Sequence, residues 1–150
     1  YVPIGCGSGI CGVIAARDAL GLATEVIGVV STQADAAQRA FESGRIEETD
    51  SARTFADGMA VRVVVPEALA IYRRGAARVV AVTDDEVAAA MRLYFACTHN
   101  VAEGAGAAPL AAAMQERDRN AGERVAAILC GGNVDTAVFA SVLRGETPAA

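Results

Sequence analysis

The chain has 150 residues, of which 53% are hydrophobic, and this is enough for about one domain with a buried core. Its formal net charge is −5, and no basic cluster is visible beyond Arg73 and Arg74, which argues against nucleic acid and anionic membrane surfaces as partners. All thirteen basic residues are arginine, so the chain contains no lysine.

The cysteines are spread along the chain, at Cys6, Cys11, Cys97 and Cys130. They form no C-x-x-C pair, and a zinc site that used Cys97 and His99 would lack the usual ligand spacing, so we expect reduced thiols and no metal site. No signal peptide is visible, and no apolar run approaches the roughly 18 residues of a membrane span. These features together predict a cytoplasmic protein.

The first residues combine an extended apolar segment, 1–4, with a glycine-rich segment, 5–12, and a helical pattern from 13 to 20. Glycines let the main chain adopt positive φ angles and approach a ligand closely, and the start of the next helix adds unpaired N–H donors. This arrangement predicts a phosphate site. A domain rarely begins inside a strand, so we also expect the chain to be the C-terminal part of a longer protein.

Apolar β-branched runs alternate with alanine-rich helical patterns along the rest of the chain, which is typical of parallel α/β folds. Further strands are expected at 24–30, 60–65, 78–82 and 124–129. Helices are expected at 34–43, 67–74, 84–97, 107–119 and 135–143. Gly44 is placed to stop the first of these helices, and Pro66 fits the first turn of the second. Thr83 and Glu86 form a capping box before the third, and the polar segment 45–59 is expected to be a long loop.

Two strand ends are rich in glycine, one after Ile4 and one after Leu129, where Cys-Gly-Gly-Asn follows at 130–133. Ligands of parallel sheets collect at the carboxyl ends of the strands, so we expect both ends to face the same crevice. Such a pair of ends suits a small flat cofactor that carries one phosphate. Pyridoxal phosphate fits this description.

Residues 7–12 also satisfy the G-x-G-x-x-G pattern of dinucleotide-binding proteins. That fold places an acidic residue near the end of the next strand, about 20 residues on, to hold the ribose hydroxyls. Residues 29–32 are Val, Val, Ser and Thr, and no arginine is placed to accept a 2′-phosphate instead. A dinucleotide site remains an alternative, as does a glycine turn that only packs a helix against a strand.

Five motifs follow one another in the order found in a known family. They are V-P-I-G-C-G-S-G at 2–9, T-F-A-D-G at 54–58, A-V-T-D-D-E at 81–86, V-A-E-G-A-G at 101–106 and I-L-C-G-G-N-V-D at 128–135. These resemble V-P-x-G-G-G-G, T-x-A-D-G, V-T-D/E-D-E, E-P-x-G-A and S/C-G-G-N-V/I-D of the fold-type II pyridoxal-phosphate enzymes, in the threonine/serine dehydratase (ammonia-lyase) and serine racemase branch. The resemblance runs from Tyr1 to about Arg144.

The resemblance implies an α/β fold in which residues 1–150 form the C-terminal part of a tryptophan synthase β-like large domain, incomplete at its N-terminus and without a second domain. It implies that five consecutive residues bind the cofactor phosphate through backbone N–H groups: Gly5, Cys6, Gly7, Ser8 and Gly9. Cys130 would contact the pyridine nitrogen, and Glu103 would lie near the ring. An inert buried thiol and a solvated loop carboxylate remain the alternatives for these two residues.

The chain departs from the family pattern in three places. The Schiff-base lysine belongs to an S-F-K-x-R-G motif further upstream, and no lysine is present here to replace it, so we assign no catalytic residue within this chain. Some relatives bind a divalent cation with two carboxylates. Val30 and Ala36 stand at these positions, with only the Ala34 carbonyl left, so we predict that this cation site is lost. Gly104 replaces the proline of the glutamate motif.

The resemblance implies a pyridoxal-phosphate-dependent ammonia-lyase that converts threonine or serine to a 2-oxo acid and ammonia, present here as a fragment that is inactive alone. Its partners would be the small amino-acid substrate and the missing N-terminal half of the same enzyme, with a homo-oligomer formed when complete. A serine or threonine racemase of the same branch and a non-catalytic phosphate-binding remnant are the alternatives. Residues 29–31 and 45–50 resemble dehydratases of hydroxyectoine utilisation.

Overall fold

The fold is built on a parallel β-sheet. The computed structural model of the chain describes residues 1–46 and 48–150. Strands β1 (Val2–Pro3), β2 (Ile27–Ser31) and β3 (Arg78–Val82) lie in the order β1-β2-β3, and both pairs of neighbours are parallel. β2 is therefore the central strand, and all five of its residues are buried. This architecture confirms the expected α/β class.

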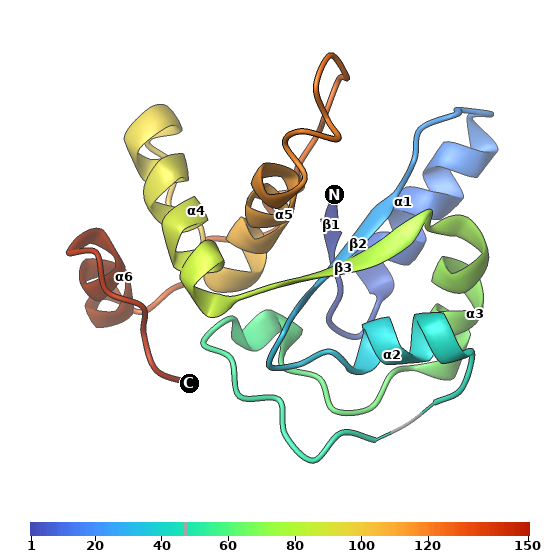
Figure 1. Cartoon of the computed structure of the whole chain (residues 1–150), viewed down its shortest axis with the longest axis horizontal. Helices are drawn as coiled ribbons and strands as arrows, with labels where there is room; N and C mark the ends of the chain where they lie inside the picture. The colour runs from blue at the N-terminus through green and yellow to red at the C-terminus, as the bar shows by residue number, and fades with distance from the viewer. Residues whose placement is uncertain (47) are drawn as a thin grey trace.

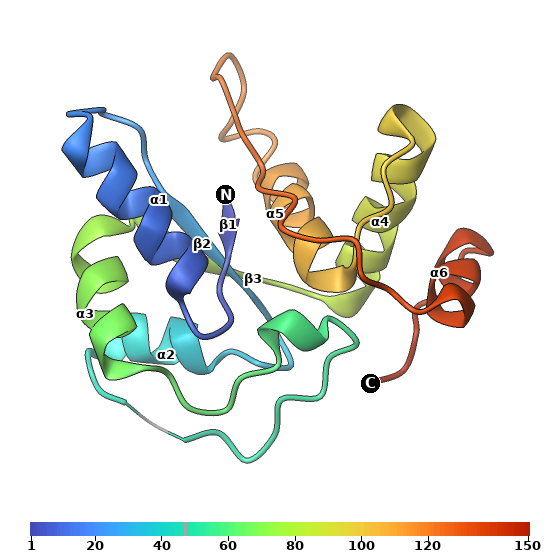
Figure 2. The same cartoon turned by 180° about the vertical axis from the view of Figure 1, so that it is seen from behind.

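Helices cover both faces of the sheet (Figures 1 and 2). Their bounds are α1 Ser8–Ala19, α2 Ala36–Ser43, α3 Pro66–Gly75, α4 Asp84–Thr98, α5 Gly104–Gln115 and α6 Thr136–Leu143, with a short 3₁₀ helix, η1, at Asp57–Met59. Helices α1, α2 and α3 lie on one face, whereas α4 and α5 lie on the other and α6 packs against α4. The sheet is therefore a middle layer between two helical layers.

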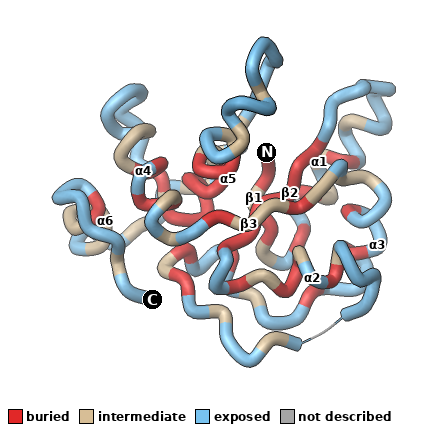
Figure 3. Tube along the Cα trace, in the orientation of Figure 1, coloured by how far each residue is buried: buried red, intermediate tan, exposed pale blue. Residues whose placement is uncertain are grey.

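Alternate side chains of the strands enter two hydrophobic cores, one on each face. The core shared with α1, α2 and α3 receives Val2, Ile4, Val30 and Val79. The core shared with α4, α5 and α6 receives Tyr1, Ile27, Val29 and Val82. Figure 3 shows that buried residues follow the strands and the inward sides of the helices. This two-sided burial explains why the strand sequences read as continuous apolar runs rather than as an alternation of apolar and polar residues.

Local signals placed several element ends correctly. The strand expected at 78–82 is β3, with the same bounds. Thr83 caps α4 through the expected capping box, in which its hydroxyl accepts the Glu86 N–H and the Glu86 carboxylate accepts the Thr83 N–H. Pro66 is the first residue of α3, and Gly44 ends α2 with a φ of 72°. These helix and strand ends depend on interactions between neighbouring residues, so they can be predicted from the sequence.

The strand expected at 60–65 is wrong, because this segment does not pair with the sheet. Its backbone bonds to a loop instead, since the Thr49 N–H donates to the Arg62 carbonyl at 3.0 Å. Only Val64 is buried, whereas Val63 and Val65 are 45% and 39% exposed. Both edges of the central strand are already taken by β1 and β3, which leaves no place beside β2 for another strand.

The buried strand expected at 124–129 is also wrong, although the segment does run beside β1. The Tyr1 amino group donates to the Ala126 carbonyl at 2.8 Å, and the Ile128 N–H donates to the Tyr1 carbonyl at 3.0 Å. Val125 and Ile128 nevertheless remain 44% and 39% exposed. Their apolar side chains lack a covering layer within the described residues, so a segment whose sequence indicates burial lies at the surface.

Two helices begin earlier than their alanine-rich patterns indicate. Helix α1 begins at Ser8 rather than after Gly12, because the chain leaves the turn at Gly7, whose φ is 96°. Helix α5 begins at Gly104 rather than at residue 107, and it ends at Gln115 rather than at 119. Glycine residues occupy both of these helix starts, and because glycine is a weak helix former, the helical pattern became recognisable only after them. None of the described helices combines the length and apolar character that a membrane crossing requires.

Candidate cofactor site

The turn at the carboxyl end of β1 presents backbone donors at the start of α1. We call residues Gly5–Gly9 the glycine turn. Gly7 is the N-cap of α1 and has no side chain that could bond the first-turn N–H groups. Among the described residues, none accepts a hydrogen bond from the N–H groups of Gly7, Ser8 or Gly9. Free N–H donors and the positive end of a 12-residue helix are features that favour binding of an anion.

Close packing behind the glycine turn requires residues without side chains. The carbonyl oxygen of Gly58 occupies the place that a Cβ atom at Gly5 would need. At Gly7, a Cβ atom would lie 2.7 Å from the Cβ atom of Ala68 in α3, and the φ of 96° already disfavours any L side chain. The glycine turn is therefore held between α3 and the segment that carries Gly58.

The second glycine-rich segment packs against the start of α5. The Glu103 N–H donates to the Gly131 carbonyl at 3.1 Å, and a Cβ atom at Gly131 would lie 2.5 Å from the Glu103 Oε1 atom. A Cβ atom at Gly106 would lie 2.5 Å from the same Gly131 carbonyl oxygen. The Glu103 carboxylate thus lies against the main chain that follows Cys130.

The Cys130 thiol lies in an environment that keeps it protonated. Partial burial raises the pKa of this thiol, and the nearby Glu103 carboxylate raises the pKa further. Both effects disfavour the thiolate. At neutral pH Cys130 therefore presents a neutral S–H group.

The structure brings both glycine-rich segments to the first turn of α5. Gly58 lies between Gly5 on one side and Ala105 on the other, because a Cβ atom at Gly58 would be 2.9 Å from the Ala105 Cβ atom. Gly106 touches Gly131 from the same helix. Cys6 and Ser8 are exposed in the glycine turn. Binding of a cofactor by the glycine turn, Cys130 and Glu103 stays a prediction.

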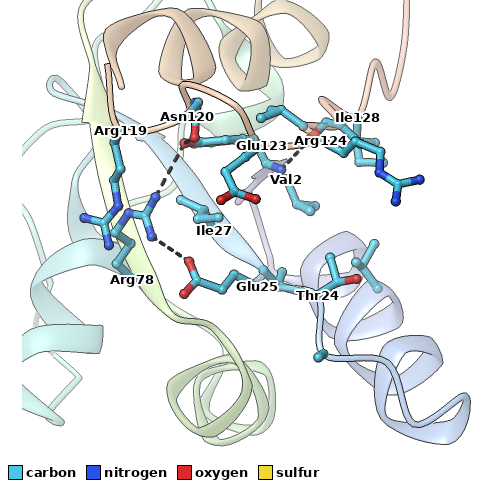
Figure 4. A pocket seen from close by; sticks show the side chains of 16 residues that line it. Val2, Thr24, Glu25, Ile27, Arg78, Arg119, Asn120, Glu123, Arg124 and Ile128 are labelled. Atoms are coloured by element: carbon cyan, nitrogen blue, oxygen red, sulfur yellow. Dashed lines mark hydrogen bonds and ion pairs between the residues drawn. The ribbon is translucent and has the colours of Figure 1, made fainter. Parts of the chain in front are cut away.

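A cavity lies elsewhere, at the amino ends of the strands (Figure 4). It has a volume of about 580 Å³, and its lining includes Glu25, Arg78 and Glu123. Arg78 forms ion pairs with Glu25 at 3.2 Å and with Glu116 at 2.6 Å. No sequence signal predicts this charged cluster, because its members are far apart in the chain and no motif joins them. Ligands of parallel sheets bind at the opposite, carboxyl ends, where the glycine turn lies.

The positions named for a cation site lie in apolar surroundings. Val30 is fully buried, and Ala34 and Ala36 are 3% and 2% exposed. Within residues 1–46 and 48–150, no group of three or more His, Cys, Asp or Glu side chains could hold a metal ion. The four cysteines are free thiols, and the Cys11 Sγ atom donates to the Ala68 carbonyl at 3.5 Å. Loss of a cation site stays a prediction.

A family model described as pyridoxal-phosphate dependent enzyme matches residues 1–131. The chain belongs to this family. It is 39% identical over 140 residues to phenylserine dehydratase of Ralstonia pickettii, and the match covers 93% of this chain and 43% of that protein.

Solved structures of the pyridoxal-phosphate-dependent family have the same fold. The processed form of threonine deaminase isoform 2 from Solanum lycopersicum matches with a TM-score of 0.89 and 27% identity, over 96% of this chain and 40% of that chain. Maize serine racemase matches with a TM-score of 0.85 and 25% identity, over 95% and 46%. The predicted tryptophan synthase β-like fold is confirmed, and the chain spans less than half the length of these relatives.

The residues present fit pyridoxal phosphate in two respects and not in a third. The N–H groups at the start of α1 and the Cβ-free packing at Gly5 suit a phosphate group, which needs several donors and a close approach of the main chain. The neutral Cys130 thiol suits a hydrogen bond to a pyridine nitrogen. Covalent attachment of the cofactor requires a lysine, which these 150 residues lack.

Proposed function

We propose that the complete polypeptide containing this sequence is a pyridoxal-phosphate-dependent ammonia-lyase, which converts a β-hydroxy amino acid such as threonine or serine to a 2-oxo acid and ammonia. The observation that carries the proposal is the glycine turn, where the N–H groups of Gly7, Ser8 and Gly9 have no acceptor among the described residues and Gly5 packs directly on the Gly58 carbonyl. The resemblance to phenylserine dehydratase and to threonine deaminase supports the reaction class.

Each predicted site residue has a role in this proposal. Residues Gly5–Gly9, which include Cys6 and Ser8, bind the cofactor phosphate through backbone N–H groups, and the dipole of α1 stabilises its charge. Cys130 would donate its S–H to the pyridine nitrogen, and Glu103 would lie beside the ring. When bound, pyridoxal phosphate supplies the electron sink that makes the α-proton of an amino acid acidic. A neutral thiol does not force the ring nitrogen to be protonated, which suits elimination of a β-hydroxyl group.

The proposal requires a second part of the polypeptide. A lysine must come from outside these 150 residues, so we expect the isolated chain to be inactive toward serine and threonine. We infer that an N-terminal half of the same enzyme supplies it and that the complete enzyme forms a homo-oligomer. We also place the enzyme in the cytoplasm, which the four free thiols support. A role in hydroxyectoine utilisation is a finer form of the same proposal.

Two alternatives each have an observation in their favour. A serine or threonine racemase of the same branch is favoured by the likeness to maize serine racemase. A non-catalytic remnant that binds only phosphate is favoured by the absence of lysine from the chain. In the racemase the product keeps its hydroxyl group, and in the remnant no reaction occurs.

One experiment separates these possibilities. The complete polypeptide is incubated with pyridoxal phosphate and either L-threonine or L-serine, and ammonia, 2-oxo acid and the D-amino acid are quantified. The ammonia-lyase proposal predicts equal amounts of ammonia and 2-oxo acid. Formation of D-serine or a D-threonine isomer without ammonia would favour the racemase. An upstream reading frame without S-F-K-x-R-G, together with no product, would favour the remnant.

A further inference from the structure

Asp84, the first residue of α4, accepts hydrogen bonds from two other parts of the chain. Its Oδ1 atom accepts the Thr54 hydroxyl at 2.6 Å and the Ser31 hydroxyl at 3.1 Å. Its Oδ2 atom accepts the Phe55 N–H at 3.3 Å. One carboxylate thus joins the end of β2, the segment 54–58 and the start of α4.

The hydroxyl groups of Ser31 and Thr54 are buried, and each both donates and accepts a hydrogen bond. Ser31 is 0% exposed and Thr54 is 5% exposed. While donating to Asp84, the Ser31 hydroxyl accepts the Gln33 N–H and the Thr54 hydroxyl accepts the Ala56 N–H, both at 3.1 Å. Each hydroxyl therefore has a fixed orientation, and a buried hydroxyl without its acceptor would be unfavourable.

The segment that Asp84 holds is the one that supports the glycine turn. From Thr54 the chain runs through Ala56, which is fully buried, to Gly58, whose carbonyl packs against Gly5. A Cβ atom at Gly104 would lie 2.7 Å from the Ala56 Cα atom, so the segment is also pressed against the start of α5. A shift of the segment would consequently move the wall behind Gly5.

We propose that Asp84 is a positioning residue for the phosphate site: its carboxylate fixes the segment 54–58, and through Gly58 it sets the shape of the glycine turn. This inference rests on the proposed function insofar as the turn binds the cofactor phosphate. Asp84 acts on the glycine turn through Thr54 and Gly58, because its carboxylate accepts hydrogen bonds from Ser31, Thr54 and Phe55.

The carboxylate can be tested by a substitution that keeps its shape. In Asp84→Asn, one oxygen can still accept the Thr54 hydroxyl, but the amide nitrogen would face the Phe55 N–H, and two donors would oppose each other. Asp85→Asn is the matched control, because Asp85 also lies in the first turn of α4 but accepts the Thr147 hydroxyl instead. The control reproduces the loss of one negative charge near the helix N-terminus.

Two readouts on the cofactor-free complete polypeptide make the test specific. Binding of pyridoxamine 5′-phosphate is measured by fluorescence titration, since this ligand needs no lysine. Hydrogen exchange is followed in peptides that contain 5–9, 54–58 and, as an internal reference, α6. We expect Asp84→Asn to weaken binding about tenfold, as the loss of one hydrogen bond to a charged group would. We also expect faster exchange in 5–9 and 54–58 but not in α6.

Each outcome has a distinct meaning. If Asp84→Asn binds the ligand and exchanges hydrogen as the wild type does, the positioning role is overturned. Equally faster exchange in all three peptides would also overturn it, because it indicates general destabilisation. If the wild-type protein fails to bind pyridoxamine 5′-phosphate, the proposed function is overturned. The exchange data would still test whether Asp84 controls the glycine turn. If Asp84→Asn does not fold, Thr54→Val removes the same link and carries the same expectations.

Discussion

The carbonyl oxygen of Gly58 fills the space that a side chain at Gly5 would need. These two glycines belong to separate motifs, and their contact joins the turn after β1 to the 3₁₀ helix η1. Gly5 is thus required for packing behind the turn, whereas Gly7 is required for its backbone conformation, with a φ of 96°.

Gly5→Ala is expected to displace the segment around Gly58, because the new Cβ atom would clash with a main-chain carbonyl, which cannot rotate away as a flexible side chain can. The change should weaken binding of pyridoxal phosphate in the complete polypeptide at least tenfold. Gly12→Ala is the matched control. Among the described residues, no atom outside the adjoining backbone of α1 lies within 4 Å of a Cβ atom at Gly12. Because this residue lies inside α1, the change should stabilise the protein by about 0.5–1 kcal/mol. Cofactor titration and urea unfolding measure the two effects. Normal cofactor affinity in Gly5→Ala would contradict the packing argument.

Glu103 is expected to control the reactivity of Cys130. Partial burial and the Glu103 carboxylate raise the pKa of this thiol, so its alkylation by iodoacetamide should require a higher pH than that of an ordinary cysteine. Glu103→Gln removes the negative charge and should shift the pH midpoint of Cys130 alkylation downward. The rate is measured by peptide mass spectrometry on cofactor-free protein. The same midpoint in both proteins would show that the carboxylate does not act on the thiol.

Glu116 is expected to make the protein sensitive to acid. Arg78 donates to both carboxylate oxygens, at 2.9 and 2.6 Å, and this contact holds the pKa of Glu116 below its ordinary value of 4.5. The ionised carboxylate therefore stabilises the fold above about pH 4.5, and this contribution is lost as the pH falls through the lowered pKa. Glu116→Gln should be less stable at pH 7 and should lose less stability on acidification. Parallel curves of unfolding free energy against pH for the two proteins would refute this role.

Tyr72→Phe is expected to stabilise the protein by about 1 kcal/mol in urea unfolding. Tyr72 is 1% exposed, its ring stacks on Phe41, and its hydroxyl is buried without a hydrogen-bond partner among the described residues. Burial also raises the pKa of this hydroxyl to about 12. Tyr94→Phe, at a partly exposed position, is the control and should change stability by less than about 0.5 kcal/mol. A loss of stability in Tyr72→Phe would mean that the hydroxyl has a partner, such as bound water.

Local sequence signals predicted much of the fold, and the two strands that they predicted wrongly failed for a common reason. The capping box at Thr83, the proline of α3 and the bounds of β3 depend on neighbouring residues, and the structure agrees with them. The segments 60–65 and 124–129 have the composition of strands, but pairing with a sheet depends on where the rest of the fold places a segment, which composition does not reveal. Both strand predictions failed because tertiary packing decides which segments join the sheet.

The candidate site was predictable only where motifs mark it. Glycine patterns located the turn at Gly5–Gly9 and the segment after Cys130. Neither the contact between Gly5 and Gly58 nor the three bonds to Asp84 could be predicted, because each joins residues that are distant in sequence and share no periodic pattern. The charged cluster around Arg78 went unpredicted for the same reason.

The most direct test of the account compares Gly7→Val and Ser8→Ala in the complete polypeptide, by equilibrium titration with pyridoxal phosphate. Backbone N–H groups bind the phosphate in this account, so Ser8→Ala should bind the cofactor nearly as the wild type does. Gly7→Val places a branched side chain at a φ of 96°, where a Cβ atom would already lie 2.7 Å from Ala68, and it should greatly weaken binding. Equal cofactor affinity in wild type and Gly7→Val would contradict the assignment of the glycine turn as the phosphate site.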